Sequence, residues 1–217
     1  MAITLILGCK QGDFNARHDG SCEGISFYFC MRALDLGPVP GLADLMQQRN
    51  IGGKVERIMD LQDQICGGLM SSGTYETGID GVPISNPSGG NLPGIRNQGK
   101  AIQAFHNLYS QEAQTLGCKS IGTLSSFFEG GFVQLLTHTI QLLIRSRRGA
   151  ALIAMQSPTP HSVALAYDGS DLYFFDPNSG VHELTNLASA ATELENHLTT
   201  RYAVPYCVHA NMFKLNH

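Results

Sequence analysis

Residues 160–178 read Pro160-His161-Ser162-Val163-Ala164-Leu165-Ala166-Tyr167-Asp168-Gly169-Ser170-Asp171-Leu172-Tyr173-Phe174-Phe175-Asp176-Pro177-Asn178. Alternating, β-branched and aromatic residues flank a two-residue Gly-Ser turn, which predicts a β-hairpin. We expect Asp168 to pair with Asp171, a register that puts residue 163 opposite residue 176. Because strand side chains alternate between faces, His161 and Asp176 should then lie diagonally across one face, within hydrogen-bonding reach. This arrangement would orient the imidazole for catalysis.

A candidate nucleophile for such an imidazole lies near the start of the chain, in Gly20-Ser21-Cys22-Glu23. The glycine and serine predict a turn, and residues 23–36 predict a helix that ends at Gly37-Pro38. Cys22 would then lie at a helix N-terminus, where backbone N–H groups and the helix dipole stabilise a thiolate. A lone cysteine is more often a small buried hydrophobe, and a lone strand histidine is more often structural. Gly-Ser-Cys with a histidine roughly 140 residues downstream is, however, typical of papain-type enzymes.

An oxyanion hole is also expected, because a tetrahedral intermediate needs preorganised N–H donors. The backbone N–H of Cys22 can supply one donor. The side-chain amide of Asn15 is our preferred second donor, and Gln11 is the other amide shortly upstream. The alternative for Asn15 is a simple role in a turn.

Together these segments resemble the YopT/AvrPphB family of bacterial effector cysteine proteases, within the papain-like superfamily. The resemblance rests on Gly-Ser-Cys-Glu-Gly, on Pro-His-Ser-Val-Ala-Leu and on Phe-Phe-Asp-Pro-Asn-Ser-Gly at 174–180, and it covers roughly residues 12–36 and 150–185. It implies Cys22 as nucleophile, His161 as base and Asp176 as the residue that orients the base. It also implies a secreted effector, cytoplasmic before export through a specialised system, that acts on a protein in another cell. The relatives cleave host signalling proteins.

Composition limits the other classes of function. The chain has 217 residues, which suits a single domain over 1–217. Only 15% of the residues are charged and the formal net charge is −4, so nothing favours nucleic acid or an anionic membrane as a partner. The six cysteines lack a Cys-x-x-Cys pair and the eight histidines lack His-Glu-x-x-His, so we expect no metal and no cofactor. No apolar run reaches the ~20 residues of a membrane-spanning helix.

The remaining pattern predicts an α+β, papain-like fold, with a helical N-terminal part that carries the cysteine and an antiparallel sheet that carries the histidine and aspartate. Composition changes over 67–99, which is rich in Gly, Ser, Pro and Asn and predicts a loop or insertion, either a substrate-binding wall or a flexible segment. Further elements are expected as follows: helices at 41–48, 55–66, 101–116, 124–147 (interrupted at 130–131) and 187–200, and strands at 1–9, 150–156 and 204–210.

The predicted function is therefore hydrolysis of an amide bond in a protein or peptide substrate by a cysteine peptidase. The same three residues can also run deamidation or transglutamination of a glutamine side chain. Two further functions fit the pattern: an NlpC-type attack on peptidoglycan peptides, and binding by a module that keeps the fold without activity.

Overall fold

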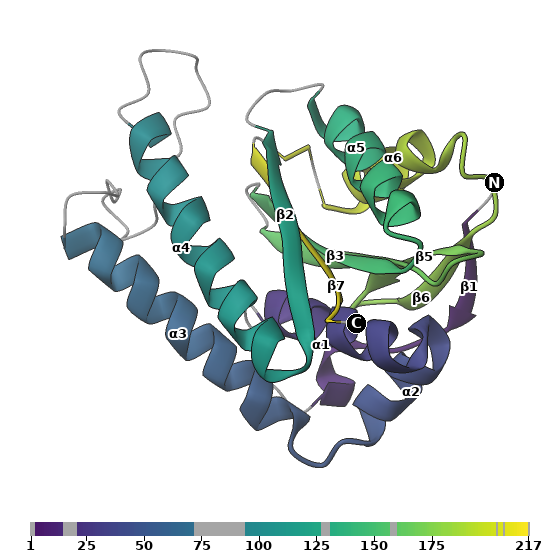
Figure 1. The fold of residues 1–217 in the computed structure, drawn as a ribbon, viewed down its shortest axis with the longest axis horizontal. Coiled ribbons are helices and arrows are strands. Elements are labelled where there is room, and N and C mark those ends of the chain that lie inside the picture. Colours follow the sequence, from purple (N-terminus) through teal and green to yellow (C-terminus); the bar gives the residue numbers. More distant parts are fainter. Residues whose placement is uncertain are drawn as a thin grey trace.

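The computed structural model of the chain describes residues 3–14, 21–71, 94–126, 131–156, 160–202, 204–205 and 207–216. One seven-stranded sheet organises these residues, with strand order β1-β6-β5-β4-β3-β7-β2 (Figure 1). All its neighbouring strands are antiparallel. The strands nearest the two ends of the chain, β1 and β7, both belong to this sheet, so a single framework joins the N-terminal and C-terminal segments.

The strands are β1 (Ile3–Leu7), β2 (Cys118–Ser126), β3 (Gly149–Gln156), β4 (His161–Tyr167), β5 (Leu172–Asp176), β6 (Gly180–Leu184) and β7 (Cys207–Leu215). The helices are η1 (Gln11–Phe14, a 3₁₀ turn), α1 (Cys22–Leu36), α2 (Pro38–Gln47), α3 (Ile51–Ser71), α4 (Gly94–Thr115), α5 (Gly131–Arg145) and α6 (Ala190–Tyr202). This is the mixed helix and antiparallel-sheet class that the sequence predicts.

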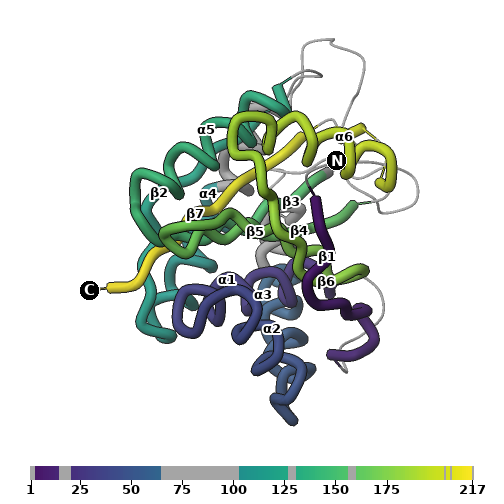
Figure 2. The backbone as a smooth tube through the Cα atoms, turned by 90° about the vertical axis from the view of Figure 1, so that its right-hand side faces the viewer, coloured from purple at the N-terminus to yellow at the C-terminus, as the bar shows by residue number. Residues whose placement is uncertain are grey.

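Helices cover both faces of the sheet, and each face has its own core (Figures 1 and 2). The first core contains α1, α2 and α3 packed on alternate residues of the central strands, such as Ala164 and Ala166 of β4. The second core contains α5 and α6 packed on the intervening residues, such as Val163 and Leu165. The period-two alternation of β4 therefore assigns its neighbouring residues to opposite faces.

The predicted hairpin is confirmed, including its register. Ala164 pairs with Phe175 and Tyr167 pairs with Leu172, which is the register that follows from pairing the two turn aspartates. The N–H of Asp168 donates to the carbonyl of Asp171 at 3.3 Å. The Asp168 carboxylate also accepts the N–H groups of the two residues that close the turn, each at 2.9 Å.

Two expectations differ from the structure. The helix predicted over 124–147 is wrong at its start, because residues 124–126 belong to β2 and pair with β7. That pairing partner lies more than eighty residues away, so local periodicity does not reveal it. The predicted loop over 67–99 is shorter than expected: α3 continues to Ser71 and α4 begins at Gly94, while residues 72–93 lie outside the described residues.

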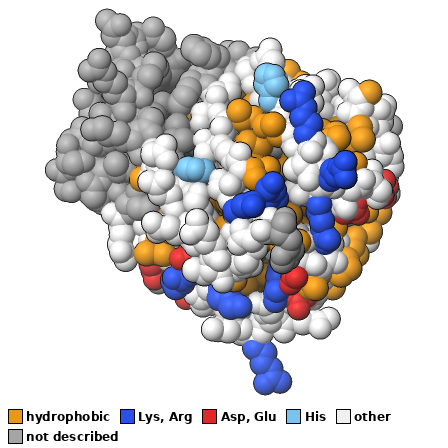
Figure 3. Space-filling view, viewed as in Figure 1, with side chains coloured by type: hydrophobic (Ala, Val, Ile, Leu, Met, Phe, Trp, Pro, Cys, Tyr) orange, Lys and Arg blue, Asp and Glu red, His pale blue; other side chains and the backbone are white. Residues whose placement is uncertain are grey.

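The surface seen in Figure 3 carries Lys and Arg side chains spread among apolar and other side chains. Among the described helices, none is long and apolar enough to cross a membrane.

Candidate active site

The turn that joins β5 to β6 fixes the position of Asp176. Asp176 is the last residue of β5, and its carbonyl accepts the N–H of Ser179 at 2.9 Å. Its side-chain Oδ1 accepts the N–H of Asn178, also at 2.9 Å. Gly180 completes the turn with φ of 114°, a conformation that favours glycine. The Asp-Pro-Asn-Ser-Gly sequence therefore builds a tight turn around one carboxylate.

His161 contacts this carboxylate across the hairpin. Its Nε2 lies 3.0 Å from Oδ1 of Asp176, and both side chains are buried. Since an ionised carboxylate can only accept, Nε2 carries the proton and donates it, which leaves Nδ1 as the basic nitrogen. The expected diagonal contact between these two residues is thus present.

The charge of Asp176 is stabilised although the side chain is fully buried. Burial alone would raise its pKa. Hydrogen bonds from His161, from the hydroxyl of Tyr202 and from the N–H of Asn178 outweigh burial and lower the pKa to about 2. The carboxylate is consequently ionised at neutral pH.

Cys22 is the first residue of α1. This helix packs on the face of the sheet that carries Ala164 and Ala166, whereas Tyr202, which stacks on His161, packs on the other face. Hydrogen bonding with Ser162, the residue after His161, lowers the pKa of the Cys22 thiol. One turn later, the hydroxyl of Ser26 donates to the carbonyl of Ser162 at 3.1 Å. The start of α1 is therefore held against Ser162, the second residue of β4.

The electrostatic balance at Cys22 differs from the sequence-based expectation. Burial raises its pKa to about 11, and the neighbouring Glu23 carboxylate contributes to this rise. The hydrogen bonds from Ser162 and from the Glu23 N–H lower the pKa, as expected for a helix N-terminus, but they do not outweigh burial. Burial therefore opposes the thiolate that the helix terminus is expected to stabilise, and the thiolate at Cys22 stays a prediction.

Glu23 connects the start of α1 to the α3–α4 pair. The hydroxyl of Tyr109 on α4 donates to Glu23 Oε1 at 2.6 Å, and the amide of Gln62 on α3 donates to the Tyr109 hydroxyl. Burial raises the pKa of Glu23, and these two hydrogen-bonding residues partly offset that effect. The chain of contacts anchors the residue after Cys22 to two further helices.

The two candidate oxyanion donors have different outcomes. Asn15 lies outside the described residues. Gln11, in η1, donates its side-chain amide to the hydroxyl of Ser21, the residue that precedes Cys22. The amide of Gln11, the less preferred candidate on sequence grounds, is therefore tied directly to the start of α1.

A cysteine–histidine contact lies on β7. The sulphur of Cys207 is 3.3 Å from Nε2 of His209, whose Nδ1 is 3.2 Å from the hydroxyl of Ser125. Burial raises the pKa of Cys207 to about 12 and lowers the pKa of His209 to about 4. Burial therefore favours the neutral forms of both side chains, in contrast to the ionised carboxylate beside His161.

Tyr202 and Ser162 are site residues that were not predicted from the sequence. Tyr202, at the end of α6, stacks on His161 with ring centroids 3.9 Å apart and donates its hydroxyl to Asp176 Oδ2 at 2.7 Å. No motif marks it, because it is the last residue of an ordinary amphipathic helix. Ser162 could have been predicted from the sequence. Because side chains alternate along a strand, the residue after His161 faces the opposite side of the sheet, where the helix that begins at Cys22 packs.

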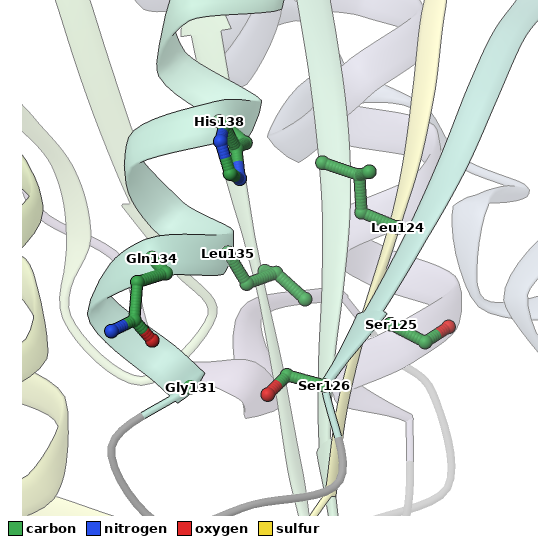
Figure 4. Close-up of a pocket in the computed structure, with 7 residues that line it drawn as sticks. All are labelled: Leu124, Ser125, Ser126, Gly131, Gln134, Leu135 and His138. Carbon is green, nitrogen blue, oxygen red and sulfur yellow. The ribbon is translucent and has the colours of Figure 1, made fainter.

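A pocket of about 280 Å³ lies between β2 and α5, apart from these residues (Figure 4). In the close-up Ser126 and Leu135 point toward each other across it, and Ser125 points away. Its lining is Leu124, Ser125, Ser126, Gly131, Gln134, Leu135 and His138. Within the described ranges, no three His, Cys, Asp or Glu side chains form a group that could hold a metal ion.

The fold and the buried histidine–carboxylate pair define a mixed α+β protein with a site suited to acid–base chemistry. Protein-family models and curated protein sequences give no match to this sequence. Solved structures do match. The crystal structure of the Pseudomonas avirulence protein AvrPphB superposes with a TM-score of 0.63 at 13% identity, over 97% of each chain. The fold resemblance that the motifs suggested is thereby confirmed.

A second similar structure is PatoxP, a cysteine protease-like domain of the Photorhabdus asymbiotica toxin PaTox. Its TM-score is 0.49 at 10% identity, and the match covers 98% of this chain and 54% of that one.

Proposed function

We propose that the chain is a papain-like cysteine peptidase of the bacterial effector or toxin type, with Cys22 as nucleophile, His161 as base and Asp176 as the residue that orients the base. The observation that carries the proposal is the 3.0 Å contact between His161 and a fully buried Asp176, next to Ser162, whose carbonyl accepts a hydrogen bond from Ser26 of the helix that Cys22 begins. The likeness in fold to an avirulence protein supports the class.

The raised pKa of Cys22 affects the first chemical step. Since the thiol keeps its proton in the free protein, Nδ1 of His161 accepts that proton as sulphur attacks the carbonyl carbon of the substrate. The imidazolium formed is stabilised by the Asp176 carboxylate. It then protonates the leaving amine as the C–N bond breaks.

The second half of the reaction releases the acyl group. His161 removes a proton from water, and the resulting hydroxide attacks the thioester to give a free acid and the Cys22 thiol. The backbone N–H of Cys22 and one side-chain amide, from Asn15 or Gln11, hold the oxyanion in both halves.

Cleavage can be tested without a known substrate. Lysate from a eukaryotic cell is incubated with wild-type protein or with Cys22→Ala, and new peptide N-termini are identified by mass spectrometry. We expect new N-termini that appear with the wild type and are absent with Cys22→Ala. Cys207→Ala, which removes the thiol that contacts His209, is the matched control and should retain the wild-type pattern.

The same spectra distinguish a peptidase from a deamidase. Glutamine side chains converted to glutamate, with intact backbones, would show a deamidase and contradict the peptidase proposal. Identical spectra for wild type and Cys22→Ala would contradict catalysis by this residue.

A further inference from the structure

Tyr202 is in contact with both His161 and Asp176. Its ring is nearly parallel to the imidazole, with an interplanar angle of 22° and a centroid separation of 3.9 Å. Its hydroxyl donates to Oδ2 of Asp176 at 2.7 Å, and the side-chain amide of Asn178 donates to that hydroxyl at 3.2 Å. One side chain from α6 thus joins the two members of the pair that come from the hairpin.

The two oxygens of Asp176 are used differently. Oδ1 faces His161 and the N–H of Asn178, whereas Oδ2 faces the Tyr202 hydroxyl and, at 3.6 Å, the guanidinium of Arg201. Because both oxygens are held, the carboxylate has a fixed plane. That plane directs one lone pair of Oδ1 at Nε2 of His161.

The ring of Tyr202 restricts the imidazole. A histidine held only by one hydrogen bond can rotate about its Cβ–Cγ bond, whereas a ring packed parallel to it at van der Waals distance opposes that rotation. Since the basic nitrogen must point at the nucleophile, this restriction controls which nitrogen is available.

We propose, building on the proposed function, that Tyr202 is the positioning residue of the site: its ring fixes the plane of His161, and its hydroxyl fixes the Asp176 carboxylate. The two tasks are separable by substitution. Tyr202→Phe keeps the ring and removes the hydroxyl, and Tyr202→Leu removes both.

Other titratable groups also face this site and stay constant when the variants are compared. They are Cys9, His182, His197 and Arg201, each of which interacts electrostatically with Asp176. Tyr167→Phe is the matched control, because Tyr167 donates its hydroxyl to the turn carbonyl of Gly169 instead of to the site.

The first readout is the carboxyl ¹³C titration of Asp176 by NMR. The Tyr202 hydrogen bond lowers the pKa of Asp176, so both Tyr202→Phe and Tyr202→Leu should raise the titration midpoint by about one pH unit. Tyr167→Phe should leave it unchanged. An unchanged midpoint in Tyr202→Phe would overturn the role of the hydroxyl.

The second readout is the His161 ring, observed through its ¹⁵N chemical shifts. Wild type and Tyr202→Phe should show a single tautomer protonated at Nε2, while Tyr202→Leu should show a mixture and lose kcat roughly tenfold or more with little change in KM. A single Nε2–H tautomer in a folded Tyr202→Leu would overturn the role of the ring. If Tyr202→Leu does not fold, Tyr202→Trp, which keeps a stacking ring without the phenol, replaces it: a single tautomer supports the role of the ring and a mixture overturns it.

Neither NMR readout depends on turnover. If Cys22→Ala leaves activity unchanged while the Tyr202 variants shift Asp176, the proposed function fails and the positioning role stands. If Cys22→Ala abolishes activity while the Tyr202 variants change neither signal, the positioning role alone fails.

Discussion

The protonation state of Cys22 determines how the reaction begins. Burial and the Glu23 carboxylate raise its pKa to about 11, so at pH 7 only about one molecule in ten thousand carries the thiolate. We therefore predict that iodoacetamide labels Cys22 slowly at pH 6–7 and about tenfold faster for each pH unit up to about pH 11. Rapid labelling that is already constant at pH 5–6 would show a preformed thiolate–imidazolium pair instead.

The Asp176 carboxylate is predicted to act through the tautomer of His161. Asp176→Asn keeps the shape of the side chain but can present an N–H to Nε2, which favours the wrong tautomer. We expect kcat to fall by about 10²–10⁴-fold while the protein still folds. Activity within a factor of two of wild type would remove Asp176 from the mechanism.

The two amides near Cys22 can be distinguished by substitution. Changing the residue that donates to the oxyanion to alanine should remove about 3 kcal/mol of transition-state stabilisation, which is measured as a lower kcat. Because the amide of Gln11 donates to the hydroxyl beside Cys22, we now expect the larger loss from Gln11→Ala and a smaller one from Asn15→Ala. The reverse order would restore Asn15 as the donor.

At the scale of the element, the turn between β5 and β6 fixes the Asp176 carboxylate. Gly180 has φ of 114°, and a Cβ added there would lie 2.0 Å from the backbone oxygen of Leu7. Gly180→Ala should therefore destabilise the protein by about 2–4 kcal/mol and displace Asp176, measured by urea unfolding. Gly12→Ala is the control, since a Cβ there meets nothing within 4 Å; equal stability of the two variants would contradict this role of the turn.

Elements differ in how far the sequence predicts them. The hairpin is predictable to its register because both strands and their turn are contiguous, and alternation then determines the contact between His161 and Asp176. The first residues of the predicted 124–147 helix belong to β2, since that strand is defined by β7 far along the chain. Tyr202 could not be predicted either, because its role arises only when α6 packs beside the hairpin.

The pKa of Cys22 also differs from what the sequence predicts. The sequence predicts its place at a helix N-terminus, and α1 does begin there. The degree of burial at that point depends on β4 and on the residues around Glu23, which are assembled only in the folded chain. Burial then decides the sign of the pKa shift.

At the scale of the whole molecule, buried histidines should make stability depend on pH. Burial lowers the pKa of His182 and His209 to about 4, from an ordinary value of 6.5. The unfolded chain therefore binds more protons between pH 6.5 and pH 4, so stability should fall as the pH is lowered through that window. Below it, Asp176 adds a further loss as the pH falls from about 4 toward 2, because its pKa is lowered in the folded protein.

Thermal unfolding at a series of pH values checks this prediction. The midpoint should fall between pH 6.5 and pH 4, and His182→Gln should reduce the slope. His138→Gln, at an exposed position on α5, should leave the slope unchanged. A flat midpoint across the window would contradict the assignment of neutral buried histidines.

The overall arrangement places the proposed nucleophile and the proposed base on different layers. Cys22 begins a helix on one face of the sheet, while His161 and Tyr202 meet on the other, and the start of β4 lies between them. The relative position of the thiol and the imidazole thus depends on how the whole sheet is assembled, and a sequence motif alone does not define it.

The central claim is that Cys22, His161 and Asp176 act as one unit, and acyl transfer tests it most directly. Wild type and His161→Ala are mixed with p-nitrophenyl acetate at pH 7, and the acetylated cysteine is located by peptide mass mapping. We predict that Cys22 is acetylated in the wild type and that the rate of its acetylation is lower by about 10²–10⁴-fold in His161→Ala. Equal rates in the two proteins, or acetylation at Cys207 in place of Cys22, would contradict the claim.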